Sequence, residues 1–146
     1  MSNYQVTLDP AFIDVEATHA FLTTTYWAQG IPLPVVRRAI AGSVCAAVRC
    51  ENQQVAFARA VTDRATFAYL ADVYVLEEHR GRGLSRAMIS ALLAHPDLQG
   101  LRRLMLATRD AHGLYAKFGF KPLANPARMM ELHNADVYAP PGPNGA

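Results

Sequence analysis

The strongest chemical signal in the chain is a short basic loop that contains two glycines. Arg80-Gly81-Arg82-Gly83-Leu84-Ser85 follows an apolar stretch and precedes a segment whose apolar residues recur at the four-residue spacing of a helix. A helix N-terminus presents unpaired N–H groups and about half a positive charge. Gly83 has no side chain to keep a bulky anion away from the backbone. The loop therefore predicts a site for a pyrophosphate, with Arg80 and Arg82 adding charge and no metal needed.

Two common phosphate-binding loops can be excluded at this position. A P-loop would end in Gly-Lys-Ser/Thr, which the segment lacks, and the dinucleotide fingerprint would have a third glycine where Arg86 stands. The remaining alternative is a glycine turn with a solvated basic rim. The apolar strand before the loop and the amphipathic helix after it favour the anion site over that alternative.

The elements that must position this loop can be read from residue periodicity. Alternating or continuous apolar runs predict strands over residues 4–8, 44–49, 54–61, 66–76, 101–108, 120–123 and 129–133. Helical spacing and breaker residues predict helices over residues 13–25, 33–41, 84–94 and 110–118. A strand meander followed by alternating helices and strands indicates a mixed α/β (α+β) sheet with helices on its faces. We expect one domain over residues 1–138 and a flexible Pro/Gly-rich tail over residues 139–146.

Composition excludes several classes of protein. The chain has 146 residues, of which 51% are hydrophobic and 18% charged, so it is not a disordered chain. A net charge of +2 gives no general field for nucleic acid. We expect no membrane segment, because no apolar run approaches the ~20 residues of a spanning helix. Cys45 and Cys50 point to opposite faces of a strand, which indicates reduced thiols and a cytoplasmic protein, and the histidines show no metal-ligand spacing.

Two motifs together resemble those of one family, the GNAT (GCN5-related) acyl-CoA N-acyltransferases, in an uncharacterised bacterial branch. The family motif Gln/Arg-x-x-Gly-x-Gly/Ala matches Arg80 to Ser85, with Ser85 departing from Gly or Ala at the last position. A second family element, LY-x-x-x-GF, matches Leu114 to Phe120, and Thr108 stands where relatives often have Asn. The order of elements agrees over residues 4–133.

The resemblance implies a fold and an acetyl-CoA site. In the GNAT fold a mostly antiparallel central sheet splays between its fourth and fifth strands, and helices cover both faces. Pantetheine lies in the gap and pairs with the fourth strand, here Val73, Tyr74 and Val75. The residues that the resemblance assigns to the pyrophosphate are Arg80, Gly81, Arg82, Gly83, Leu84, Ser85 and Arg86. Acetyl-CoA would be a cosubstrate, and no metal is expected.

Tyr115 matches the family's general acid, which protonates the departing thiolate of CoA. The alternative for Tyr115 is packing against neighbouring aromatic side chains. The general base is open: Tyr69 occupies the place of a fourth-strand Glu found in some relatives, and Asp72 is the nearest acid on that strand. Asp72 is equally consistent with a structural carboxylate, and Asp110 is equally consistent with a helix N-cap. A water chain is a further candidate for the base.

The acceptor pocket in this reading is built by the loop after the first helix and the end of the sheet. Its candidate residues are Tyr26, Trp27, Gln29, Ile31 and Tyr69. The resemblance implies an N-acetyltransferase that acts on a small-molecule primary amine by direct attack on the thioester. A macromolecular amine, on a protein or a charged tRNA, is the rival acceptor. A non-catalytic acyl-CoA sensor and a partner-binding scaffold are the rival functions, and a homodimer is possible.

Overall fold

The computed structural model describes residues 3–140, and it divides the chain between Ala107 and Thr108 into two compact units. The single domain expected over residues 1–138 therefore stays a prediction. Residues 141–146 of the expected tail lie outside the described residues.

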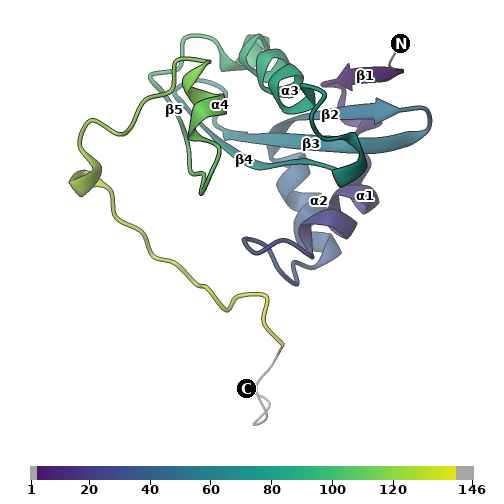
Figure 1. The fold of residues 1–146 in the computed structure, drawn as a ribbon. Coiled ribbons are helices and arrows are strands. Elements are labelled where there is room, and N and C mark those ends of the chain that lie inside the picture. Colours follow the sequence, from purple (N-terminus) through teal and green to yellow (C-terminus); the bar gives the residue numbers. More distant parts are fainter. Residues whose placement is uncertain (1–2, 141–146) are drawn as a thin grey trace. The chain divides into compact units, whose positions relative to one another are not determined.

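The first unit is built on a five-stranded sheet whose spatial order follows the sequence (Figure 1). The strands are β1 (Tyr4–Thr7), β2 (Ser43–Cys50), β3 (Gln53–Thr62), β4 (Phe67–Val75) and β5 (Arg103–Leu106). The first four are joined antiparallel, and β5 pairs parallel to β4. This is the mixed, mostly antiparallel sheet that the sequence predicted. A parallel neighbour needs a crossover connection, which the segment containing α3 supplies.

Helices cover both faces of this sheet. Figure 1 shows α3 (Leu84–Leu93) on one face and α1 (Val15–Leu22) and α2 (Leu33–Ala41) on the other. The helix expected over residues 13–25 is shorter, because Asp14 caps α1 by accepting a hydrogen bond from the N–H of Ala17 at 2.9 Å. Pro34 lies in the first turn of α2, where its missing N–H costs nothing.

The core of the first unit lies where α3 packs on the central strands. Met88, Ile89 and Leu92 of α3 are fully buried there. Phe57 of β3 is also fully buried, but it lies on the other face of the sheet beside Tyr74, which stacks on Phe21 of α1. Small residues alternate along β2 and β3, among them Ala46 and Ala58, both fully buried, so a helix can approach the strands closely. Burying each large apolar side chain stabilises the fold by about 1.5–3 kcal/mol. This packing fixes the loop that joins β4 to α3.

The second unit contains α4 (His112–Ala116) and a short 3-10 turn at Pro126–Arg128. The strands predicted over residues 120–123 and 129–133 are wrong, because neither segment pairs with a neighbour in the structure. Pro122 has no N–H to contribute to a ladder, which disfavours a strand over residues 120–123. The apolar side chains that suggested strands are exposed instead, including Met130 at 95% and Leu132 at 105%.

The two cysteines are free thiols, as the sequence predicted: Cys45 is buried and Cys50 is half-buried. Over residues 3–140, every helix is too short or too polar to cross a bilayer.

Candidate functional site

The predicted anion loop lies between the end of β4 and the start of α3, where the sequence placed it. Gly81 and Gly83 both have φ of +76°, a left-handed conformation that glycine adopts without strain. Gly83 is the N-cap of α3 and supplies no side-chain hydrogen bond to the first turn. A Cβ built at either glycine meets no protein atom within 4 Å, so open space lies in front of the loop backbone. These features fit an anion bound to backbone N–H groups.

Contacts on either side of the loop hold it in place. Arg80 Nε donates a hydrogen bond of 2.9 Å to the carbonyl of Val75, which ties the loop to the end of β4. The Arg82 guanidinium lies 5.9 Å from the ring centroid of Tyr4. The Tyr4 hydroxyl is 2.8 Å from Nδ1 of His79, the residue just before the loop. Sequence reasoning missed Tyr4 and His79, because they are 75 positions apart and no local pattern links them.

The strand that precedes the loop has an open edge. The ladder between β4 and β5 ends at the pair Leu70 and Leu106, whereas the ladder between β4 and β3 continues to Val75. The N–H of Leu76 donates to the carbonyl of Val55, so the N–H and C=O of Val75 point away from β3. Within the first unit, residues 71–75 thus form the splayed stretch of β4 that the family resemblance predicted.

The three residues expected to meet pantetheine differ in what they expose. Val73 and Val75 are half-buried. The side chain of Tyr74 is buried, stacks on Phe21 at a centroid distance of 4.0 Å and accepts a hydrogen bond from Gln54 Nε2. Burial raises the pKa of Tyr74 above its usual value. The Tyr74 side chain is therefore part of the core, and only its backbone can face a ligand.

The remaining loop residues lie on the first turn of α3. Leu84 is buried in the core, Ser85 is half-buried and Arg86 is exposed. Only Ser85 and Arg86 thus have side chains available to an anion at this turn.

Asp72 occupies a β-bulge in the open stretch of β4. Its φ is +56°, a left-handed value that Asp tolerates better than most residues, and the β3–β4 register shifts between Phe57 and Arg59 opposite it. One carboxylate oxygen accepts 2.8 Å from Arg59 Nε and the other accepts 2.9 Å from Trp27 Nε1. Both oxygens therefore accept hydrogen bonds from N–H donors, one of them cationic, an arrangement that fits the structural alternative.

The acceptor-loop candidates lie on different sides of a compact turn. A hydrogen bond from Gly30 N–H to the Thr23 carbonyl closes the segment between α1 and α2. Trp27, at 45% exposure, and Tyr26, at 62%, lie edge to face on its outer surface, with ring centroids 5.0 Å apart. The side chain of Gln29 is also exposed.

The other two acceptor candidates are less accessible. Ile31 is buried, and its carbonyl lies 3.0 Å from His19 Nε2, so it supports the turn from within. Tyr69 is half-buried on β4, paired with Val61 and Met105.

In the second unit, Tyr115 lies on α4 and is 7% exposed. Its ring meets Phe120 edge to face at 5.8 Å. Burial raises the pKa of Tyr115 above its usual value, which keeps the phenol protonated at neutral pH. The helix N-cap is Ala111, whose N–H donates to the Thr108 hydroxyl at 3.0 Å, so the expectation that Asp110 caps this helix is wrong.

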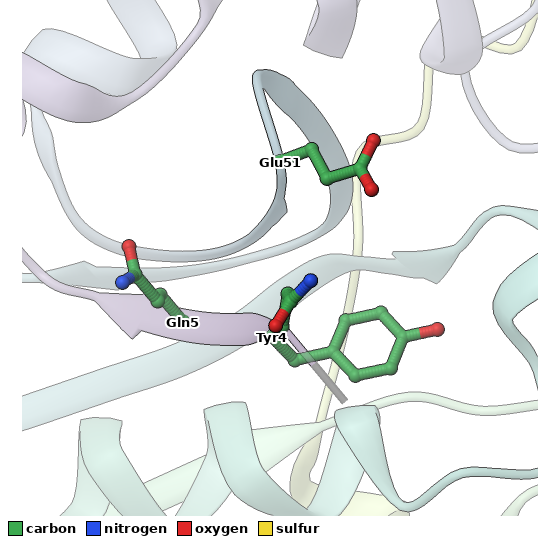
Figure 2. Close-up of a pocket in the computed structure, with 4 residues that line it drawn as sticks. Tyr4, Gln5 and Glu51 are labelled. Carbon is green, nitrogen blue, oxygen red and sulfur yellow. The ribbon is translucent and has the colours of Figure 1, made fainter. Parts of the chain in front are cut away.

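A hollow of about 400 Å³ lies beside the start of β1, lined by Asn3, Tyr4, Gln5 and Glu51 (Figure 2). Figure 2 shows that Glu51 comes from the β2–β3 turn and that the ring of Tyr4 extends away from it. An acidic lining does not suit a pyrophosphate, and none of the predicted site residues lines this hollow. Over residues 3–140, no cluster of three His, Cys, Asp or Glu side chains could hold a metal ion.

Comparison with known proteins gives a consistent assignment. The family model described as an acetyltransferase (GNAT) domain matches residues 41–122. A candidate acetyltransferase of the fungus Gibberella zeae is 34% identical over 138 residues, covering 79% of this chain and 77% of that protein.

Solved structures agree. The crystal structure of a candidate GNAT acetyltransferase from Xanthomonas campestris pv. campestris is 50% identical with a TM-score of 0.91, covering 96% of this chain and 99% of that one. A candidate acetyltransferase from Clostridium acetobutylicum, solved with acetyl-CoA, shares the fold alone, at 18% identity and a TM-score of 0.64, covering 91% of this chain and 96% of that one.

Proposed function

Since the chain belongs to the GNAT family of acetyltransferases, we propose that it transfers an acetyl group from acetyl-CoA to the primary amine of a small molecule. The observation that carries the proposal is the continuity of two features in one unit. The open edge of β4 runs directly into a glycine loop whose backbone faces free space. An extended pantetheine arm needs the first feature and a pyrophosphate needs the second.

The proposed roles follow the direction of the chain. Pantetheine pairs with the outward backbone of Val73 and Val75, and the pyrophosphate binds the N–H groups from Gly81 to Ser85. The Val75 carbonyl already accepts from Arg80, so the Val75 N–H is the group that can polarise the thioester carbonyl. Arg82 and Arg86, both exposed, add positive charge around the phosphates.

The reaction we propose is a direct transfer. The neutral amine attacks the thioester carbonyl carbon, the C–S bond breaks and the amide forms. Tyr115 gives its phenolic proton to the leaving thiolate, and the family resemblance is the basis of that role. The proton lost by the amine passes to water, because both oxygens of Asp72 already accept hydrogen bonds.

Calorimetric titration with acetyl-CoA, followed by thiol release in the presence of an amine panel, tests this function. The panel holds small amines, amino acids, and peptides with a free N-terminus or a lysine. Micromolar binding with amine-dependent thiol release supports the enzyme. Binding with no release from any amine favours the acyl-CoA sensor, and release only with peptides favours a macromolecular acceptor. Absence of binding at tens of micromolar rejects both the enzyme and the sensor.

We also propose that the protein forms a homodimer in the reducing environment of the cytoplasm. Met129, Met130 and Leu132 support the first part, because they are exposed apolar side chains close together in sequence, and clustered exposed apolar residues mark interaction sites. The unpaired thiols support the second. Light scattering after size-exclusion chromatography tests the dimer, and a monomer mass at high micromolar concentration refutes it.

A further inference from the structure

The bond between Trp27 and Asp72 links the loop after α1 to the sheet. It joins residues 45 positions apart, one on the outer surface of a turn and the other in the open stretch of β4. The Asp72 side chain is only 9% exposed and pairs with Arg59, whose side chain is 19% exposed. Arg59 is held in turn by Ser43, whose hydroxyl donates to the Ala39 carbonyl at the end of α2. Trp27 is therefore anchored at its N–H to a network built into the sheet.

The anchor leaves the indole ring itself accessible. Trp27 is 45% exposed and its neighbour Tyr26 is 62% exposed, although the turn that carries them is closed by backbone bonds and packed from within by Ile31. A large ring that is fixed at one end and partly exposed is suited to contact a flat apolar group. The indole N–H and both Asp72 oxygens are already paired, so these groups offer no charged contact to a ligand.

We propose that Asp72 is a positioning residue that holds Trp27 as the platform of the acceptor site, and that the acceptor is a primary amine with a flat apolar group. This inference rests on the proposed acetyl transfer. It places the amine beside the stretch of β4 from which the thioester would be presented, because Asp72 belongs to that stretch. It also predicts that Asp72 influences acceptor binding and does not take the proton.

Asp72→Asn is the informative variant. Asn tolerates the left-handed backbone as Asp does, so the bulge is retained. Its amide has one accepting oxygen, whereas Trp27 and Arg59 both present N–H donors. Because a hydrogen bond from a charged donor is the stronger, the single oxygen stays with Arg59 and the Trp27 N–H loses its acceptor. Asp97→Asn is the matched control, because it makes the same substitution in an ion pair outside the Trp27 network. The partner of Asp97 is Arg64 in the β3–β4 turn, and both side chains are half-exposed.

Trp27 is the single tryptophan of the chain, so its fluorescence reports the anchor directly. In Asp72→Asn we expect the acrylamide quenching constant of Trp27 to rise about twofold and its anisotropy to fall, with Asp97→Asn like wild type. Arg59→Lys keeps the charge beside Asp72 and should preserve the wild-type signal. Unchanged quenching and anisotropy in Asp72→Asn overturn the positioning role, whether or not acetyl transfer is found.

Kinetics with acetyl-CoA test the acceptor, using 2-phenylethylamine and ethanolamine as probes. We expect a higher kcat/KM for 2-phenylethylamine. Asp72→Asn should raise its KM about tenfold, leave the KM for acetyl-CoA unchanged and preserve the shape of the pH profile. A double variant with Trp27→Phe should be no worse than Trp27→Phe alone, since Asp72 acts through that ring.

Three kinetic outcomes overturn the inference. Loss of kcat together with the acidic limb of the pH profile in Asp72→Asn would make Asp72 the base. Additive effects of the two substitutions would separate Asp72 from Trp27. Turnover confined to amines without a flat apolar group would reject the acceptor class. Failure of wild-type protein to bind acetyl-CoA counts instead against the proposed function.

Discussion

Replacing Gly83 with alanine separates the anion-binding role of the loop from its contribution to folding. Gly83 has φ of +76°, and the added Cβ meets no protein atom within 4 Å. The cost to the folded state is therefore backbone strain alone, about 1–2 kcal/mol for a residue with a Cβ in the left-handed region. For a domain of this size that strain lowers Tm by roughly 3–6 °C.

The effect on acetyl-CoA should be larger than the strain explains. The new methyl group lies in the open space that the phosphates are proposed to occupy, where their oxygens must come within about 3 Å of backbone N–H groups. Loss of one such charged hydrogen bond costs about 1.5–3 kcal/mol. That corresponds to a Kd raised roughly 10-fold to 100-fold. Isothermal titration calorimetry at a temperature well below the lowered Tm measures the change.

Gly100→Ala is the matched control for this substitution. Gly100 has φ of +70° and open space around its added Cβ, but it lies in the turn before β5 and not in the loop. We expect the same loss of Tm and an unchanged Kd for acetyl-CoA. Wild-type affinity in Gly83→Ala would refute the anion site. Equal loss of affinity in both variants would show that strain, and not obstruction, weakens binding.

Three other substitutions or measurements test separate parts of the structure. Tyr115→Phe should lower kcat about 100-fold with an unchanged Kd for acetyl-CoA. In the wild-type enzyme, Tyr115 should cause no loss of activity near pH 9, because burial raises its pKa. Burial also raises the pKa of Cys45 to about 12, so only Cys50 should react with a thiol reagent at pH 8 in the native state. The folded state keeps a proton that an unfolded thiol loses near pH 9, so the stability due to Cys45 falls as pH rises from about 9 to 12. Hydrogen bonds from the hydroxyl and N–H of Thr66 hold the pKa of Asp63 well below its usual 3.8. The ionised Asp63 carboxylate therefore contributes its full stabilisation above pH 3.8, and this stabilisation is lost as the pH falls below 3.8 toward the lowered pKa. Urea unfolding at decreasing pH should show a weaker acid dependence in Asp63→Asn than in wild type.

The central sheet and the anion loop could be predicted because their signals are local. The polar turn around Asn52 separates two apolar runs, so a hairpin was readable from spacing, and β2 and β3 end within a few residues of the expected positions. The left-handed backbone of the loop favours glycine at Gly81 and Gly83, so a pattern of residue types is enough to locate the loop.

What the sequence could not show depends on contacts between distant residues. The left-handed bulge at Asp72 and its bond to Trp27 have no signal in the neighbouring residues, since their partners lie in other elements. The two late strands were predicted from apolar alternation in residues 120–123 and 129–133. A strand also needs a neighbour to pair with, and periodicity alone carries no information about that neighbour.

The order of the strands has a consequence for folding kinetics. Strands β2, β3 and β4 pair with their neighbours in sequence through short turns, so this part of the antiparallel meander closes only short loops. The β4–β5 pair, by contrast, requires the whole crossover segment to be organised first, from Leu76 to Arg102. We therefore expect the edge where acetyl-CoA is proposed to bind to form late. A ligand bound there would slow unfolding far more than it speeds folding.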